Sequence, residues 1–387
     1  MEKDKQVKSS RAGRYVGQSS GYSAFMPQPL PPNPPIKYDD EMQYLLSLAD
    51  TALGRLDGSM DLVPDIDFFV YMYVSRESVL SSQIEGTRAS LIDELELEAG
   101  LPVSSGSTDA DEIRNYIEAM NYGLKRLEEL PLCLRLLREI HEKLLAGVRG
   151  HNRSPGQFRK SQNWIGPEGS TIETAAYIPP CVEYMNESLG NLEKFLHSVE
   201  FMPILIRTGL IHAQFETIHP FLDGNGRVGR LLITLFLCQQ KVLKRPLLYI
   251  SHYFKQNQSQ YYDMLQAVRK QQDGWEKWLK YFLRGVYIVA QESAKTGAGI
   301  ISLRERHRQI VSKNLKTKSN LGLQLLEKLY RNPVVSPKTA AALLGAAQAT
   351  TNALLNDFVE LGILTEQTGK KRNRIYIYRD YVQMFMD

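Results

Sequence analysis

Apolar residues recur three and four positions apart over most of the chain, which is the spacing of one buried helix face. The clearest case is segment 66–84, which predicts a single amphipathic helix. Further helical windows follow at 91–98, 109–129, 133–145, 182–196, 204–217, 227–240, 258–270 and 274–294. The pattern predicts a mainly α-helical body that begins near Asp39.

Segment 163–179 interrupts this helical body. Gly166, Pro167 and Gly169 bring turn chemistry between two short runs of β-prone residues. We expect a small β-hairpin here.

The two ends of the chain have a different character. Residues 1–37 include six prolines between positions 27 and 35. Because proline lacks an amide donor and favours extended backbone, this segment is expected to be a tail. This tail would be a tether, a strap that lies over the folded surface, or a ligand for a proline-recognising module. Residues 296–319 are expected to form a basic linker.

The last part of the chain, 320–387, predicts a domain of its own. Three helical segments (321–330, 337–344 and 350–361) precede two alternating runs on either side of 369–372. Three short helices followed by a β-hairpin describe a winged helix-turn-helix.

Length and composition narrow the class of protein. The 387 residues suggest two or three domains, and 43% hydrophobic with 23% charged residues is typical of a soluble globular chain. A net charge of +4 is too small to predict a nucleic-acid or membrane partner. Three widely spaced cysteines, the lack of a visible secretory signal and the lack of an apolar run of spanning length favour a soluble, cytoplasmic protein.

The segment 218–230, IHPFLDGNGRVGR, carries the candidate chemistry. Its glycines let the backbone approach a ligand closely, and the N–H groups that open the following helix form an anion site. Arg227 and Arg230 share one helical face and can grip phosphate oxygens. Asp223 is placed to hold Mg²⁺ together with nucleotide oxygens, and His219 can accept a proton. These residue types predict phosphoryl or nucleotidyl transfer.

The same residues match the signature HxFx[DE]GNGRxxR, so the chain resembles the Fic-domain proteins over roughly residues 40–295. The resemblance implies a mainly α, Fic-type helical bundle with a small β-hairpin flap, for which 163–179 is the candidate. It also implies a protein adenylyltransferase, a nucleotidyltransferase that moves AMP from ATP to a protein hydroxyl. The domains are then 38–110 with the inhibitory helix and 111–295 as the catalytic domain.

The resemblance assigns a role to each position of the signature. His219 would be the general base on the target hydroxyl, and Asp223 would hold Mg²⁺. Asn225, Gly226 and Arg227 would bind the α- and β-phosphates, and Arg230 would reach the γ-phosphate. The remaining nucleotide-binding positions are Gly224, Val228, Gly229 and Tyr262. Tyr262 would contact the base, although an aromatic pair with Tyr261 is also ordinary core.

A second motif, SSQIEG at 81–86, resembles the family's inhibitory helix. Ser81 and Glu85 are four residues apart and therefore lie on one helical face. In the resemblance, Glu85 forms a salt bridge with Arg230 and withholds this arginine from ATP. In some relatives the same glutamate assists removal of AMP.

Other histidines and arginines are expected to be structural. His212 precedes His219 by two helical turns, but it lacks the further ligands of a metal site. Arg159 is expected to support the flap.

The sequence leaves three functions open. The first is an autoinhibited adenylyltransferase that acts on a Ser, Thr or Tyr hydroxyl of a target protein or of itself, as a monomer or homodimer. The second is a Fic-type site that removes AMP or uses another nucleotide donor. The third is a DNA-binding regulator with a nucleotide-sensing body. In this third case polar residues at 348–352 would read bases, and Lys370, Lys371, Arg372 and Arg374 would form a basic wing.

Overall fold

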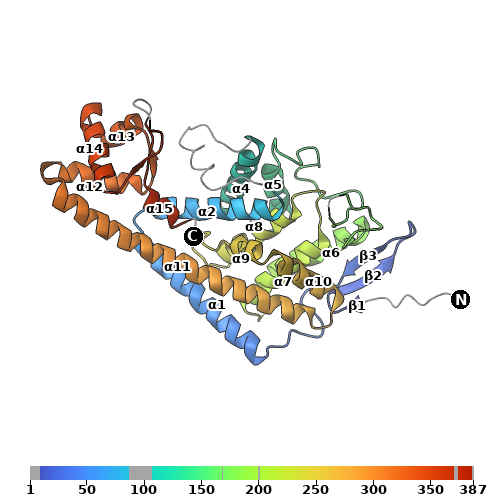
Figure 1. Cartoon of the computed structure of the whole chain (residues 1–387). Helices are drawn as coiled ribbons and strands as arrows, with labels where there is room; N and C mark the ends of the chain where they lie inside the picture. Colours follow the sequence, from blue (N-terminus) through green and yellow to red (C-terminus); the bar gives the residue numbers. More distant parts are fainter. Residues whose placement is uncertain (1–8, 87–106, 168, 199–200, 370–373, 386–387) are drawn as a thin grey trace.

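The computed structural model describes residues 9–86, 107–167, 169–198, 201–369 and 374–385. Two long helices, α1 (Asp40–Ser59) and α11 (Gly274–Asn314), pack along one another and form one side of the molecule (Figure 1). A three-stranded sheet lies near the start of α11, and a small C-terminal domain lies at its other end (Figure 1). Within the described residues, no helix is both long and apolar enough to cross a bilayer.

The remaining helices fill the space beside this pair. They are α2 (Ile66–Ile84), α4 (Ser107–Arg126), α5 (Leu134–Leu144), α6 (Val182–His197), α7 (Ile204–Ile218), α8 (Asn225–Gln239), α9 (Ser251–Gln256) and α10 (Gln258–Lys270), with a 3₁₀ turn at Met60–Leu62. Side chains cap two of the helices: Asp39 accepts from the Met42 N–H at the start of α1, and Asp65 accepts from the Phe68 N–H at the start of α2. The predicted helix 66–84 is confirmed to the residue, whereas α9 was not predicted and window 91–98 lies outside the described residues.

Helices α7 and α8 form the centre of the core. All but one residue of α7 and most of α8 are buried, which explains why their sequences are apolar on every side. The two helices pack against each other and are joined by the signature loop. The loop is therefore held at both ends by the most deeply buried part of the molecule.

The expectation that residues 1–37 form a tail is wrong over most of the described part of this segment. Strands β1 (Ser9–Ser10), β2 (Gly13–Gly17) and β3 (Ser23–Pro27) form an antiparallel sheet in the order β1-β2-β3. Phe25 is fully buried, and Gly13 has φ 155 with space for no side chain, because a Cβ would lie 2.2 Å from the Met26 carbonyl oxygen. The prolines begin only where β3 ends, so they mark the exit from the sheet.

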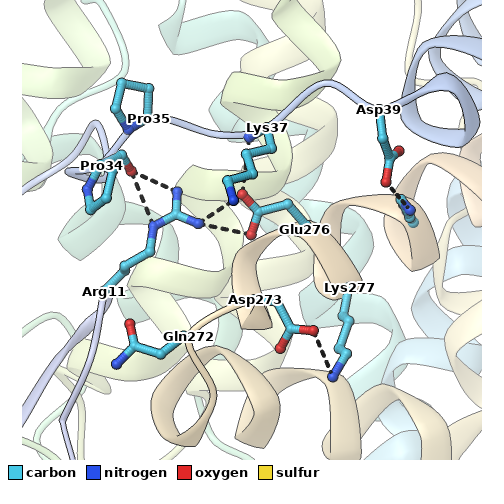
Figure 2. Close-up of a pocket in the computed structure, with 10 residues that line it drawn as sticks. Arg11, Pro34, Pro35, Lys37, Asp39, Gln272, Asp273, Glu276 and Lys277 are labelled. Carbon is cyan, nitrogen blue, oxygen red and sulfur yellow. Dashed lines mark hydrogen bonds and ion pairs between the residues drawn. The ribbon is translucent and has the colours of Figure 1, made fainter.

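Polar contacts hold the proline-rich segment against the start of α11 (Figure 2). Glu276 accepts from the Arg11 guanidinium at 2.7 Å and from the Lys37 N–H at 3.0 Å. The same guanidinium donates to the carbonyl of Pro34. This arrangement corresponds to the strap interpretation of the segment.

The expected basic linker is also wrong, because α11 continues through it to Asn314. Leu303, His307 and Val311 are buried at helical spacing, so the segment has an apolar face of its own. Arg304 and Arg308 pair with Glu327 of the next helix. The basic residues lie on a helix surface and do not mark an unstructured connection.

The expected hairpin at 163–179 is reduced to a single bridge. Ile165 and Tyr177 exchange two backbone hydrogen bonds, of 2.8 and 3.0 Å, with turns between them. On its other side the segment is extended by β3, since the Phe25 N–H donates to the Ile178 carbonyl. We call residues 163–179 the flap.

The C-terminal domain contains the predicted helices and a small sheet. Its elements are α12 (Ser319–Leu329), β4 (Val334–Val335), α13 (Pro337–Leu344), α14 (Gln348–Glu360), β5 (Thr365–Glu366), β6 (Tyr376–Ile377) and α15 (Arg379–Gln383), after a 3₁₀ turn at Lys316–Lys318. The strand order is β4-β6-β5. Lys370, Lys371 and Arg372 lie outside the described residues, and the winged-helix assignment stays a prediction.

Burial of the N-terminal sheet predicts a stability effect that a tail would not show. Phe25 packs edge-on against Tyr15, at 5.1 Å between ring centroids, and against Tyr177 of the flap. We expect Phe25→Ala to lower the free energy of unfolding by about 3–5 kcal/mol, measured by denaturant titration. Tyr44→Ala, at a position that is 65% exposed, is the control and should change it by less than about 0.5 kcal/mol. Equal stability of both variants would contradict the packing described.

Candidate active site

His219 occupies an unusual backbone position at the end of α7. Its φ of 49 places a non-glycine residue in the left-handed region, where the helix stops and the loop begins. The carbonyl oxygen of His219 accepts from Arg159 Nε at 3.1 Å and from Asn163 Nδ2 at 3.2 Å. The flap and its flanking residues therefore hold the backbone of His219, as expected for Arg159.

Asn225 shapes the loop from inside. Its Oδ1 accepts from the Phe221 N–H, and its Nδ2 donates to the Phe221 carbonyl, both at 2.8 Å. Asn225, which is predicted to bind phosphate, thus uses its side chain to close the loop. Its backbone forms the first residue of α8. Gly224, with φ 74, makes the turn that lets α8 begin.

His141 of α5 supports the same loop, and sequence reasoning missed it. Its ring stacks on Phe221 at 3.8 Å between centroids, and its Nε2 lies 3.0 Å from the Asp223 carbonyl oxygen. Because Nδ1 accepts from the Gly156 N–H, the proton is on Nε2 and donates to Asp223. Burial lowers the pKa of His141 to about 4, so the ring stays neutral. A lone histidine in a helix gives no sequence signal of such a role.

Arg230 is the most constrained charge of the site. Its Nε donates to Ser81 Oγ at 2.7 Å, and its Nη2 donates to the Ser81 carbonyl at 2.9 Å and to Glu85 Oε1 at 2.8 Å. The structure therefore brings together the residues that the two motifs predicted. Burial works to lower the pKa of Arg230, but the Glu85 carboxylate raises it well above the ordinary value. Conversely, burial works to raise the pKa of Glu85, and the charge of Arg230 lowers it.

Glu85 also covers the start of α8. A Cβ placed on Gly226 would lie 2.2 Å from Glu85 Oε1, so the carboxylate rests directly on the first turn of this helix. The N–H groups of a first turn attract anions. Glu85 thus occupies a position that favours an anion.

A cavity of about 560 Å³ lies beside this contact. Its wall includes His219, Gly226, Arg230 and Glu85 of the predicted set, together with Tyr262, which is 44% exposed. The flap, α10 and one residue of α7, Glu216, contribute the rest of the lining: Trp164, Ile165, Gly166, Pro167, Ala176, Glu216, Tyr261, Leu265, Gln266 and Arg269. The cavity is large enough for a nucleotide-sized ligand.

Three other predicted positions, Arg227, Val228 and Gly229, lie behind this wall. Val228 is fully buried, and Gly229 packs against Glu216, so neither is part of the lining. Arg227 is 1% exposed and lies 3.4 Å from Glu112 and 3.6 Å from Asp223. It therefore links the loop to α4 through Glu112, which the sequence did not indicate.

His212 is structural, as expected. Its two ring nitrogens face the Gly229 carbonyl at 2.8 Å and the Tyr261 hydroxyl at 2.9 Å. Tyr261 is therefore largely core, at 1% exposure, although it contributes to the cavity wall, whereas Tyr262 is 44% exposed. In the part of the chain that the structure describes, no group of three or more His, Cys, Asp or Glu side chains forms a metal site.

Arg269 of α10 is a second charge that the sequence did not indicate. Its guanidinium lies over the Tyr177 ring at 3.8 Å and donates to the Glu216 carbonyl at 3.2 Å. Burial, and after it the charge of Arg269, lowers the pKa of His219 to about 3. His219 is therefore neutral at physiological pH, as a general base must be.

Comparison with known proteins agrees with this geometry. Residues 44–125 match the family described as Fic/DOC family N-terminal, and residues 131–237 match the Fic/DOC family. The fold resembles that of a Fic family protein from Desulfovibrio desulfuricans G20, with a TM-score of 0.58 and 19% identity, covering 91% of this chain and 98% of that structure. The molecule is thus mainly helical with a fold like that of a Fic family protein, and two of its segments match descriptions of the Fic/DOC family.

Named relatives match over part of the chain. The Aedes aegypti "Protein adenylyltransferase Fic" is 29% identical over 250 residues, covering 59% of this chain and 46% of the relative. The Aquifex aeolicus "Probable protein adenylyltransferase" is 27% identical over 179 residues, covering 46% of this chain and 52% of the relative. The chain therefore spans about half the length of these curated relatives.

Because His141 supports the loop, we expect its removal to lower both the stability of the protein and its affinity for ATP. His141→Ala would leave the Gly156 N–H and the Asp223 carbonyl without their partner, and we expect a loss of about 1–3 kcal/mol in unfolding free energy. ATP affinity, measured by calorimetry in a Glu85→Gly background, should also fall, because the loop loses its fixed shape. The control is His151→Ala, at an exposed position, for which both quantities should stay near the parent values. Unchanged ATP affinity in His141→Ala would contradict this role.

Proposed function

We propose that the chain is a protein adenylyltransferase that transfers AMP from ATP to a hydroxyl side chain of a protein and is held inactive by Glu85. The observation that carries the proposal is the contact of Glu85 with Arg230 beside His219, inside a cavity of nucleotide size. The names of the matched relatives support this activity.

The chemistry follows from the positions of these groups. Neutral His219 takes the proton of the target hydroxyl, and the oxygen attacks the α-phosphorus of ATP. A new O–P bond forms while the bond to the bridging oxygen of the β-phosphate breaks, and pyrophosphate leaves with the electron pair. The N–H groups at the start of α8 and Arg230 would hold the phosphates in line for this attack.

Glu85 inhibits in two ways in this proposal. It satisfies Arg230, which is then unavailable to the γ-phosphate. It also places a carboxylate against the first turn of α8, and negative charge there repels a phosphate. Both effects end when Glu85 leaves, while Ser81 still holds Nε of the arginine.

Asp223 fits a magnesium ion that is shared with the nucleotide. Its carboxylate is 37% exposed, and its Oδ1 accepts from the Gly224 N–H at 2.6 Å, so it lies at the open side of the loop. Mg²⁺ commonly binds proteins through one or two carboxylates and completes its shell with phosphate oxygens and water. The ion would neutralise charge on the phosphates, and Asp223 would fix its place.

Removing the inhibitory carboxylate tests the function directly. With α-labelled ATP and cell lysate or the chain itself as acceptor, we expect Glu85→Gly to raise protein labelling at least about tenfold over wild type. Adding His219→Ala to this variant should lower labelling by about 10²–10⁴-fold, because the general base is lost. Glu85→Gln is the matched control, which keeps the size but not the charge and should give an intermediate gain.

The proposal is overturned if Glu85→Gly binds ATP but labels no protein. Parallel reactions with the other labelled nucleotides would identify a different donor. Release of AMP from a previously labelled protein would identify the reverse reaction.

The magnesium role predicts a specific loss in Asp223→Asn. In the Glu85→Gly background this substitution keeps the side-chain size and removes the charge, so labelling should fall at least about tenfold. ATP affinity measured with and without EDTA should then no longer depend on Mg²⁺. The surface variant Asp273→Asn should keep the full Mg²⁺ dependence, since this carboxylate pairs with Lys277 away from the cavity. A full Mg²⁺ effect in Asp223→Asn would contradict the assignment.

A further inference from the structure

The last turn of α7 carries two buried polar atoms that lack a hydrogen bond among the described residues. They are Nδ1 of His219 and Oε1 of Glu216, three residues earlier in the chain, although the main chain of Glu216 also interacts with the His219 ring and raises its pKa. The other carboxyl oxygen of Glu216 lies 3.8 Å from this Nδ1. The distance is too long for a hydrogen bond, but catalytic contacts often shorten only when substrate is bound.

The backbone holds the two groups next to each other. The His219 N–H donates to the Phe215 carbonyl at 2.9 Å, and Arg159 and Asn163 hold the His219 carbonyl. Since φ of His219 is fixed at 49, the ring has only its own torsions left.

Gly229 makes room for the carboxyl group. A Cβ at this position would lie 2.4 Å from Glu216 Oε1, so any larger residue would displace it. Glu216 itself is only 6% exposed. A buried carboxyl for which the next helix leaves space calls for a partner, because an unpaired polar group in the interior is costly.

We propose that Glu216 is a positioning residue for His219: its carboxyl accepts a hydrogen bond from the Nδ1–H group and thereby leaves Nε2 as the proton acceptor toward the cavity. The proposal rests on the transfer reaction proposed above. When the target hydroxyl gives its proton to Nε2, the imidazolium keeps its Nδ1 proton and the Glu216 carboxylate stabilises the positive charge. The proton returns to solvent after AMP transfer.

The surroundings of Glu216 link this role to inhibition. Burial raises the pKa of Glu216 to about 7, Arg230 of α8 and Arg269 of α10 lower it, and Glu85 of α2 raises it. Tyr261 also faces the carboxyl and is itself neutral, since burial and the charge of Glu216 raise its pKa. When Glu85 leaves, one negative charge is removed and the ionised form of Glu216 is favoured. Release of the inhibitory residue would therefore also prepare the base.

Kinetics in the Glu85→Gly background test the proposal. Labelling is followed from about pH 5 to about pH 9 for the parent, Glu216→Gln and Glu216→Leu. We expect Glu216→Leu to lower kcat about 100-fold with a small change in KM for ATP, and Glu216→Gln to retain part of the rate because its amide oxygen still accepts. The rise of the parent's rate as Glu216 ionises should be absent in both variants. Gly229→Ala, which displaces the carboxyl without removing it, should also lower kcat.

A change confined to KM for ATP would mean that Glu216 acts on ATP binding through Arg230, and this result would overturn the proposal. An unchanged kcat with an unchanged pH profile would overturn it as well. If the Glu85→Gly parent labels no protein, the proposed function fails, and a second measurement then decides the role of Glu216.

That measurement is the tautomer of His219 in the otherwise unchanged chain. Nitrogen NMR of ¹⁵N-histidine protein, with the His219 signals assigned from His219→Asn, distinguishes a protonated Nδ1 from a protonated Nε2. We expect the Nδ1–H form in wild type and a mixture of both forms in Glu216→Leu. The same tautomer in both proteins would overturn the proposal, whatever the reaction is.

Discussion

The site is organised around one buried charge, the guanidinium of Arg230. A charge in the interior is tolerated only when it is paired and hydrogen-bonded, and here Ser81 and Glu85 of α2 supply both. The consequence is that α2 must lie against α8, with its C-terminal end over the first turn of that helix. Any ligand that needs Arg230 has to compete with a contact that also supports the packing of α2.

The same helix is bound at several further points. Glu77 accepts from the Ser251 N–H of α9 at 3.1 Å and from the Tyr116 hydroxyl of α4 at 3.3 Å, and burial raises its pKa to about 7. Near the start of α2, Phe68 packs against Tyr381 of the C-terminal domain at 5.7 Å between ring centroids. These contacts hold the main part of α2 in place, whereas Glu85 and Gly86, which directly follow its last turn, are exposed.

The N-terminal sheet supports the site from the side of the flap. Phe25 hydrogen-bonds to the flap through its backbone and contacts Tyr177 through its ring, and Tyr177 lies under Arg269. Arg269 in turn holds the end of α7, which carries His219. A segment whose composition suggested an appendage is therefore part of the support of His219. The composition did not indicate this role, because it depends on contacts with the flap and α10, which are distant in the sequence.

The sequence by itself determined the helices with a regular apolar face and the residues of the two motifs, since both are local: helical spacing needs only the neighbouring turn, and Ser81 and Glu85 share a face in any helix. Which groups meet was decided by the tertiary structure. His141 contacts the signature loop, and Arg269 contacts the end of α7, across long distances in the chain, whereas the contact of Asn225 with Phe221 spans only four residues. No local pattern encodes the contacts of His141 and Arg269, because these side chains have their partners only after the core has packed.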